Sequence, residues 1–246
     1  MSGIDHYLQT IQQHLTTVFT KERHVIDLAV DALVDATINK HNIFVFGASH
    51  AGILSYELTY RAGGLATINP VEASGLNLAT RPITKTSENE RTLGYGTSIA
   101  NEVPLQPNDV VLVHSVSGRN NVMIDFVQRV KERGAMVIAI TNVAYSSEVT
   151  SRHPSGQRLF EIADIVIDNH GVPGDAVVNL PGLPQAVGPT STVIGAAIVN
   201  SIVVGVTEQL LAKGINPPVF FSANLDGGDS HNKTIFDTYK NHIFYM

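Results

Sequence analysis

The amino-acid sequence predicts an α/β fold, a doubly wound parallel sheet of five strands with helices on both faces. Two observations predict it. Short apolar runs alternate with segments of helical periodicity along the 246 residues, as in folds built from repeated strand–helix units. The runs are apolar at every position rather than at every second one, which is typical of parallel strands that are covered on both faces.

The first part of the chain shows this alternation in order. Residues 4–39 carry apolar side chains at helical spacing and predict one helical segment that ends at 41–42. Residues 43–46 predict the first strand. The turn at 47–52 leads into a helix through about residue 62, which Gly63 and Gly64 close. Residues 65–69 predict the second strand.

The middle of the chain continues the pattern. Residues 70–108 are interpreted as a loop followed by a helix near 88–101. Residues 110–113 predict the third strand, residues 120–133 a helix, and residues 137–140 the fourth strand. Residues 162–167 lead to the fifth strand. A loop rich in glycine and proline spans 171–189.

The segment 191–206 is almost continuously apolar, which raises the question of a membrane span. Asn200 and Ser201 interrupt its middle, and no basic residues flank it, whereas a spanning helix usually needs about 20 apolar residues. We therefore predict a buried central or interface helix and no membrane partner. A polar tail and a last helix near 231–244 follow.

These elements predict three parts. A helical segment over residues 1–40 packs on an α/β domain over residues 41–214. A C-terminal tail over residues 215–246 completes the active site or an interface.

Composition excludes several classes of protein. Hydrophobic residues make up 43% and charged residues 15%, which is typical of a globular chain and not of a disordered one. Sixteen Lys and Arg stand against 22 Asp and Glu, a net charge of −6 that argues against a general nucleic-acid binder. The absence of cysteine excludes disulfides, cysteine-ligated metals and thiol nucleophiles. The first residues do not form a signal peptide, so we expect a cytoplasmic protein.

Two loops between a strand and a helix are candidate anion sites. The first, residues 47–52, offers backbone N–H groups and the hydroxyl of Ser49 at a helix start. The second, residues 115–121, adds Ser115, Ser117, Arg119 and Asn120. Either loop could also be a tight turn with a simple helix cap. Because the carboxyl ends of neighbouring strands meet at one edge of a sheet, we expect the two loops to form one site.

The second loop and the strand after it resemble the SIS (sugar isomerase) domain. The resemblance rests on the Ser-x-Ser-Gly-x-Asn pattern at 115–120 and on the run Arg-Gly-Ala-Met-Val-Ile-Ala-Ile-Thr-Asn at 133–142. The N-terminal helix, the turn at 47–52 and the apolar helix after 188–192 are similar too. Motifs at 151–153, 174–176, 188–192 and 222–229 resemble an uncharacterised subfamily.

The resemblance implies a flavodoxin-like three-layer α/β/α sandwich, a homo-oligomer (dimer or tetramer) and an anion site that holds a sugar phosphate. We expect neither a metal nor another cofactor. Among the residues that bind zinc in phosphoheptose isomerases, only Glu57 has a counterpart in this sequence. The last helix could lend His231 to a neighbouring subunit. The residues expected to bind substrate are Ser49, His50, Ser115, Ser117, Gly118, Arg119, Asn120, Thr190, Ser191, Thr192 and His231.

Aldose–ketose isomerisation needs a carboxylate that moves a proton between C1 and C2 and an acid/base group that opens the sugar ring. Glu57, Glu72 and Glu90 are the candidate bases, and His50 and His153 the candidates for ring opening. His114 lies within a strand and is interpreted as a satisfied core histidine.

The main hypothesis is therefore a sugar isomerase that forms an enediol from a hexose with a 6-phosphate or a 6-sulfonate. A sulfonate is tetrahedral like a phosphate but carries less charge. One alternative is a lyase similar to MurNAc-phosphate etherases, in which Glu57 and Glu90 eliminate a C3 substituent from an amino-sugar phosphate. The other is a sugar-phosphate sensor without catalytic activity.

Overall fold

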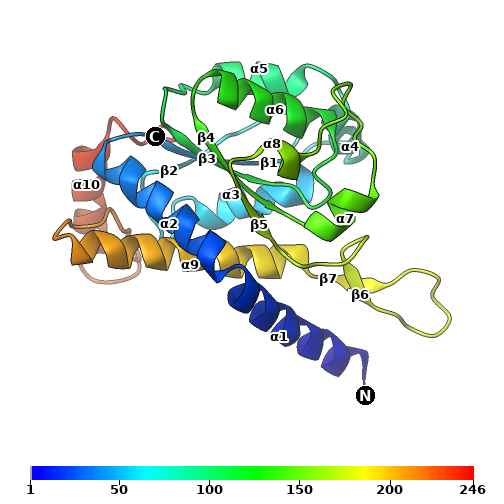
Figure 1. Ribbon diagram of the computed structural model, residues 1–246. Helices are drawn as coiled ribbons and strands as arrows, with labels where there is room; N and C mark the ends of the chain where they lie inside the picture. Colours follow the sequence, from blue (N-terminus) through cyan, green and yellow to red (C-terminus); the bar gives the residue numbers. More distant parts are fainter. Residues whose placement is uncertain (1) are drawn as a thin grey trace.

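The computed structural model describes residues 2–246 and contains the predicted five-stranded parallel sheet (Figure 1). The strands lie in the order β2-β1-β3-β4-β5. Their bounds are β1 Ile43–Gly47, β2 Ile68–Pro70, β3 Val110–His114, β4 Met136–Thr141 and β5 Ile165–Asp168. The order reverses between β1 and β3, so the carboxyl ends of these two strands border the crevice where ligands bind in such sheets.

Helices cover both faces of the sheet and complete three layers. One face carries α5 (Tyr95–Glu102) and α6 (Asn121–Glu132), and the other carries α2 (Arg23–Ile38), α3 (Ile53–Leu58) and α9 (Ser191–Ala212). Alternate residues of β3 point to opposite faces of the sheet. Leu112 packs in the core beneath α2 and α9, whereas Val113 packs in the core beneath α6. Period-two alternation therefore also places His114 on the α9 face.

The apolar segment forms α9, which packs along α2 and α3 in the core, as predicted for a buried central helix. It is the one helix among residues 2–246 that is long and apolar enough to cross a membrane by length and composition. Its close packing depends on small residues: a Cβ at Gly195 would lie 2.6 Å from Leu54, and one at Gly205 would lie 2.8 Å from Val30.

The N-terminal segment differs from the prediction, because it is two helices rather than one. Helix α1 (Gly3–Lys21) ends at Lys21, Glu22 separates it from α2, which begins at Arg23, and α1 extends away from the domain (Figure 1). The Glu22 carboxylate lies 2.8 Å from Nε2 of His170, just after β5. The break thus lies where a contact with a residue distant in sequence holds the chain, which local periodicity does not reveal.

The predicted helix over 88–101 is also two helices, α4 (Thr84–Glu90) and α5. Gly94 separates them with φ +82°, and its N–H donates to Asp125 Oδ2 at 2.6 Å. The helix after the first loop is shorter than predicted and ends at Leu58. The second strand is 68–70 rather than 65–69. The loop over 171–189 contains an unpredicted antiparallel hairpin, β6 (Ala176–Val178) with β7 (Val187–Pro189).

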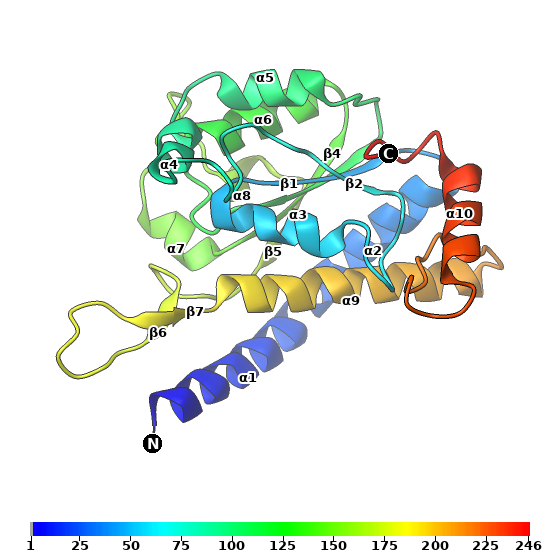
Figure 2. The same ribbon diagram turned by 180° about the vertical axis from the view of Figure 1, so that it is seen from behind.

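Short helices fill the remaining connections. Residues 49–52 form a 3-10 turn, and α7 (Val143–Glu148) and α8 (Leu159–Ile162) follow β4. The last helix, α10, spans Gly228–Tyr239 and ends before the predicted boundary at 244. The tail packs at the β2 edge of the sheet (Figure 2), where Asn69 Nδ2 donates to the carbonyl oxygens of Ile43 and His242. Within a single protomer the C-terminal tail therefore supports the edge of the sheet and does not line the cavity described below.

Candidate functional site

A cavity of about 330 Å³ lies at the carboxyl ends of β1 and β3. The turn after β1, the loop after β3, the first turn of α6 and the start of α9 line it. The predicted site residues in its wall are Ser49, His50, Glu90, Ser115, Ser117, Asn120 and Ser191. The two loops predicted to hold an anion therefore face one space.

The turn after β1 is shaped by close backbone contacts. A Cβ at Gly47 would lie 2.5 Å from the carbonyl oxygen of Ala51, so only glycine fits there. Ser49 adopts φ +56°, and its N–H donates to the carbonyl oxygen of Leu76 at 2.7 Å. A non-glycine residue with positive φ is strained and is maintained only by its surroundings. This turn places the Ser49 and His50 side chains at the cavity.

The loop after β3 leaves the start of α6 open to a ligand. Asn120 occupies the cap position, but its side chain makes no capping hydrogen bond. The N–H groups of the first helical turn have no acceptor within a helix, and two residues of that turn, Val122 and Met123, line the cavity. Together with the hydroxyls of Ser115 and Ser117, this end of α6 has the donors that an anion needs.

The Asn120 side chain instead joins two charged groups. Its Nδ2 donates to Glu90 Oε2 at 2.5 Å, and its Oδ1 accepts from Arg152 Nη1 at 2.7 Å. Burial raises the pKa of the Glu90 carboxyl above its usual value. The Asn120 hydrogen bond and the charges of Arg152 and Arg91 act in the opposite direction without cancelling this effect.

The other two candidate bases lie elsewhere. Glu57 Oε1 accepts from Asn200 Nδ2 at 2.7 Å and forms an ion pair with Arg61, between α3 and α9. Glu72 Oε2 accepts from Tyr56 Oη at 3.3 Å in a small neighbouring pocket. Of the three glutamates, only Glu90 lines the cavity.

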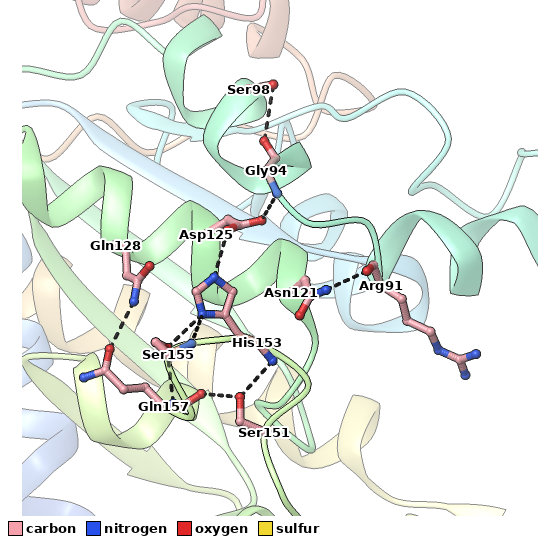
Figure 3. A network of polar contacts seen from close by, with 10 residues as sticks. All are labelled: Arg91, Gly94, Ser98, Asn121, Asp125, Gln128, Ser151, His153, Ser155 and Gln157. Atoms are coloured by element: carbon pink, nitrogen blue, oxygen red, sulfur yellow. Dashed lines mark hydrogen bonds and ion pairs between the residues drawn. The ribbon is translucent and has the colours of Figure 1, made fainter.

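His153 is part of a structural network rather than of the cavity wall (Figure 3). The backbone N–H of Ser155 donates to Nδ1 at 3.2 Å, which makes Nδ1 an acceptor. The proton is therefore on Nε2, which donates to Asp125 Oδ1 at 3.0 Å. Because Asp125 also accepts from Gly94 N, the pair ties the loop after α7 to α6 and to the start of α5.

Asp175 is a cavity residue for which the sequence predicted no role. Its carboxylate accepts from the backbone N–H groups of Thr190 and Ser191 at 3.0 and 2.7 Å, and from both hydroxyls. It thereby caps α9 and holds Ser191 at the cavity. The signal that could have found it is an aspartate in a glycine-flanked motif shortly before the apolar helix.

The remaining predicted binding residues do not line the cavity. Thr190 is buried, and Thr192 is half-buried on α9. His231 stacks on Phe221 with ring centroids 4.0 Å apart and donates from Nε2 to the carbonyl oxygen of Val219. Gly118 is buried with φ +57° and shapes the loop, whereas Arg119 donates to Thr150 Oγ1 at 3.4 Å.

His114 is only half satisfied, which differs from the prediction of a satisfied core histidine. Its Nδ1 lies 3.0 Å from the carbonyl oxygen of Ala51, but its Nε2 has no partner among residues 2–246. Among the same residues, no group of three histidine or acidic side chains is placed to hold a metal ion.

The fold and this cavity define the class of protein. The SIS domain family matches residues 6–142, and the chain belongs to that family. Within it, the chain is 47% identical to a UPF0309 protein of Shouchella clausii and 46% identical to one of Oceanobacillus iheyensis, each over 100% of both chains. The predicted resemblance to the SIS domain family is thus confirmed.

A solved structure agrees with the fold. A phosphoheptose isomerase from Francisella tularensis is similar with a TM-score of 0.54 and 15% sequence identity, over 85% of this chain and 100% of that one. At this identity the likeness concerns the fold alone.

The His153–Asp125 network predicts an effect on stability. We expect Asp125→Ala to destabilise the fold by about 1–3 kcal/mol, because it removes the acceptor of the Gly94 N–H and of Nε2 of His153, whose side chain is only 10% exposed. Glu132→Ala, which removes an exposed ion pair with Arg129 on the same helix, should cost at most about 1 kcal/mol. Urea unfolding followed by circular dichroism measures both; equal losses would contradict the structural role of the network.

Proposed function

We propose that this protein is an aldose–ketose isomerase that acts on a sugar phosphate through an enediol. The observation that carries the proposal is the position of Glu90, a half-buried carboxylate beside the hydroxyls and open helix start of the loop after β3. A sugar whose phosphate lies at the start of α6 would extend its carbon chain into a cavity that contains one candidate base.

The charges around the cavity favour a phosphate over a sulfonate. Burial lowers the pKa of Arg152, and the charges of Arg119 and Arg91 lower it further. Arg152 donates to Asn120 Oδ1 at the cavity wall, and a positive charge there suits a ligand with nearly two negative charges better than a ligand with one. Because Arg152 adds a positive charge beside the hydroxyls of this loop, the phosphate is the stronger candidate and the 6-sulfonate the alternative.

In this reaction the Glu90 carboxylate takes the proton from C2 of the open-chain aldose. The electron pair of the C–H bond forms the C1–C2 double bond, and the carbonyl oxygen at C1 takes the negative charge. The proton of the hydroxyl at C2 passes to this oxygen, the proton held by Glu90 returns to C1, and O2 becomes the oxygen of the ketone. A base is most effective when its pKa lies near the working pH. The raised pKa of Glu90 brings this carboxylate closer to that condition.

The structure disfavours the etherase-like alternative. That reaction assigns roles to Glu57 and Glu90 together, whereas Glu57 is bonded to Asn200 and Arg61 outside the cavity. The sensor alternative uses the same cavity, and turnover separates it from an enzyme.

We expect Glu90→Gln to lower kcat by about 100- to 10,000-fold, the usual contribution of a general base. The measurement is deuterium uptake at C1 or C2 in heavy water, followed by NMR on a panel of aldose and ketose phosphates and 6-sulfohexoses. Glu88→Gln, an exposed glutamate of the same helix, is the matched control and should keep full activity. Binding without uptake in the wild type would identify a sensor, and release of an acid would identify a lyase.

The charge of Arg152 predicts a shift in the pH profile. The base is active as a carboxylate, so kcat rises with pH through the pKa of Glu90. Arg152 lowers that pKa; Arg152→Gln should therefore raise it and move the acid limb to higher pH. Arg129→Gln, on an arginine of the last turn of α6 that does not line the cavity, should leave the limb in place. A limb that stays fixed or moves to lower pH in Arg152→Gln would contradict the assignment of Glu90.

We also propose that the protein is a homo-oligomer, as the resemblance implies. Helix α9 exposes Val204 by 66% and Leu211 by 58%, and Leu28 of α2 is exposed by 43%. A groove between α1, α2 and α9 adjoins them. A second copy of this apolar surface is the occupant that would cover it. The predicted cytoplasmic location, like the absence of nucleic-acid partners, stays a prediction.

We expect Val204→Glu to convert the oligomer to a monomer, because a charge would be buried in an apolar interface. Light scattering after size-exclusion chromatography measures the mass. Ser98→Glu, on an exposed position of α5 on the other side of the sheet, is the control and should keep the oligomer. A monomeric wild type, or an oligomer that survives Val204→Glu, would contradict this assignment.

A further inference from the structure

The histidine at the end of the central strand is enclosed and yet incompletely bonded. His114 is the last residue of β3 and is 3% exposed, and its ring forms part of the cavity wall. Buried polar groups almost always have a hydrogen-bond partner. The Nε2 atom of His114 has none among residues 2–246, so it needs an explanation.

The neighbours of the ring fix its protonation. The carbonyl oxygen of Ala51 can only accept, so Nδ1, 3.0 Å away, carries a proton and donates it. In a neutral imidazole the other nitrogen, Nε2, is then an unprotonated acceptor. Burial lowers the pKa of His114, an effect opposed by the Ala51 hydrogen bond and the charge of Asp175, so the ring stays neutral near pH 7.

No donor among residues 2–246 lies within hydrogen-bond distance of Nε2. The Ala51 carbonyl already accepts from Nδ1. Asp175, which borders the same cavity, is an acceptor when ionised. The Ser191 hydroxyl donates to Asp175 Oδ2 at 2.5 Å. A donor for Nε2 would therefore come from the occupant of the cavity, and a sugar hydroxyl is such a donor.

We propose that Nε2 of His114 accepts the hydrogen bond of the anomeric hydroxyl and opens the sugar ring. This inference rests on the proposed isomerase function and adds a catalytic residue to it. The nitrogen is buried, so the proposal requires the cavity wall to open when the sugar enters.

The step is a proton transfer between two oxygens on one carbon. Nε2 takes the proton of the hydroxyl at C1, and the C1–O1 bond becomes a carbonyl. The bond between C1 and the ring oxygen breaks, and its electron pair stays on the ring oxygen. The same proton then passes from Nε2 to that oxygen. The open-chain aldose results, and His114 returns to its neutral form without any co-reactant.

His114→Asn tests this role, because an asparagine amide can still donate to the Ala51 carbonyl but cannot accept a proton as a base. Two kinds of substrate separate ring opening from the later steps. Hexose 6-phosphates are mostly cyclic. Pentulose 5-phosphates are acyclic, because the phosphate occupies the hydroxyl that would close the ring. The exposed His24 on α2 provides the control variant His24→Asn.

We expect His114→Asn to lower kcat/KM about 100-fold on the hexose phosphates, the lower end of acid–base contributions. Its activity on the pentulose phosphates should stay near that of the wild type, which also shows that the variant is folded. His24→Asn should match the wild type on both. Equal losses on both substrates, or no loss on either, would overturn the inference while leaving the isomerase proposal intact. A wild type that turns over none of these sugars overturns the proposed function instead.

Discussion

The hydrogen bonds of the Asn120 side chain hold a carboxylate and a guanidinium in place at the cavity. An asparagine at the start of a helix usually accepts from the backbone of the first turn. Here its amide donates to Glu90, and its oxygen accepts from Arg152. The backbone N–H groups of α6 remain open for an anion, while a carboxylate and a guanidinium are fixed beside it. The anion site and the candidate base thus depend on one residue.

His153 and His114 differ in how completely their ring nitrogens are hydrogen-bonded. Both nitrogens of His153 are bonded, to Asp125 and to Ser155, so that side chain is part of the framework. His114 is bonded at one nitrogen only, and the bond leaves an acceptor at the other. The contrast separates a histidine that holds elements together from one that has capacity left for a ligand. An acid/base role therefore fits His114 better than His153.

Some features were predictable from sequence because they are local. Strands β1, β3 and β4 each contain a continuous apolar run of four or five residues, and the two loops contain the glycines and hydroxyls that a turn before a helix requires. The break at Glu22 was not predictable, because its partner is His170, which is distant in the sequence. Glu57, Glu72 and Glu90 could not be distinguished either, since packing alone brings α4 against α6. His114 was misread because a buried strand position says nothing about which ring nitrogen is bonded.

The position of Glu90 relative to the bound sugar is the central claim. The most direct measurement is a crystal structure with a hydroxamate analogue of the enediol that carries a terminal phosphate. We predict that the phosphate contacts the N–H groups at the start of α6 and the hydroxyls of Ser115 and Ser117, with the hydroxamate within hydrogen-bond reach of Glu90. A phosphate bound elsewhere, or a hydroxamate that contacts neither Glu90 nor His114, would contradict it.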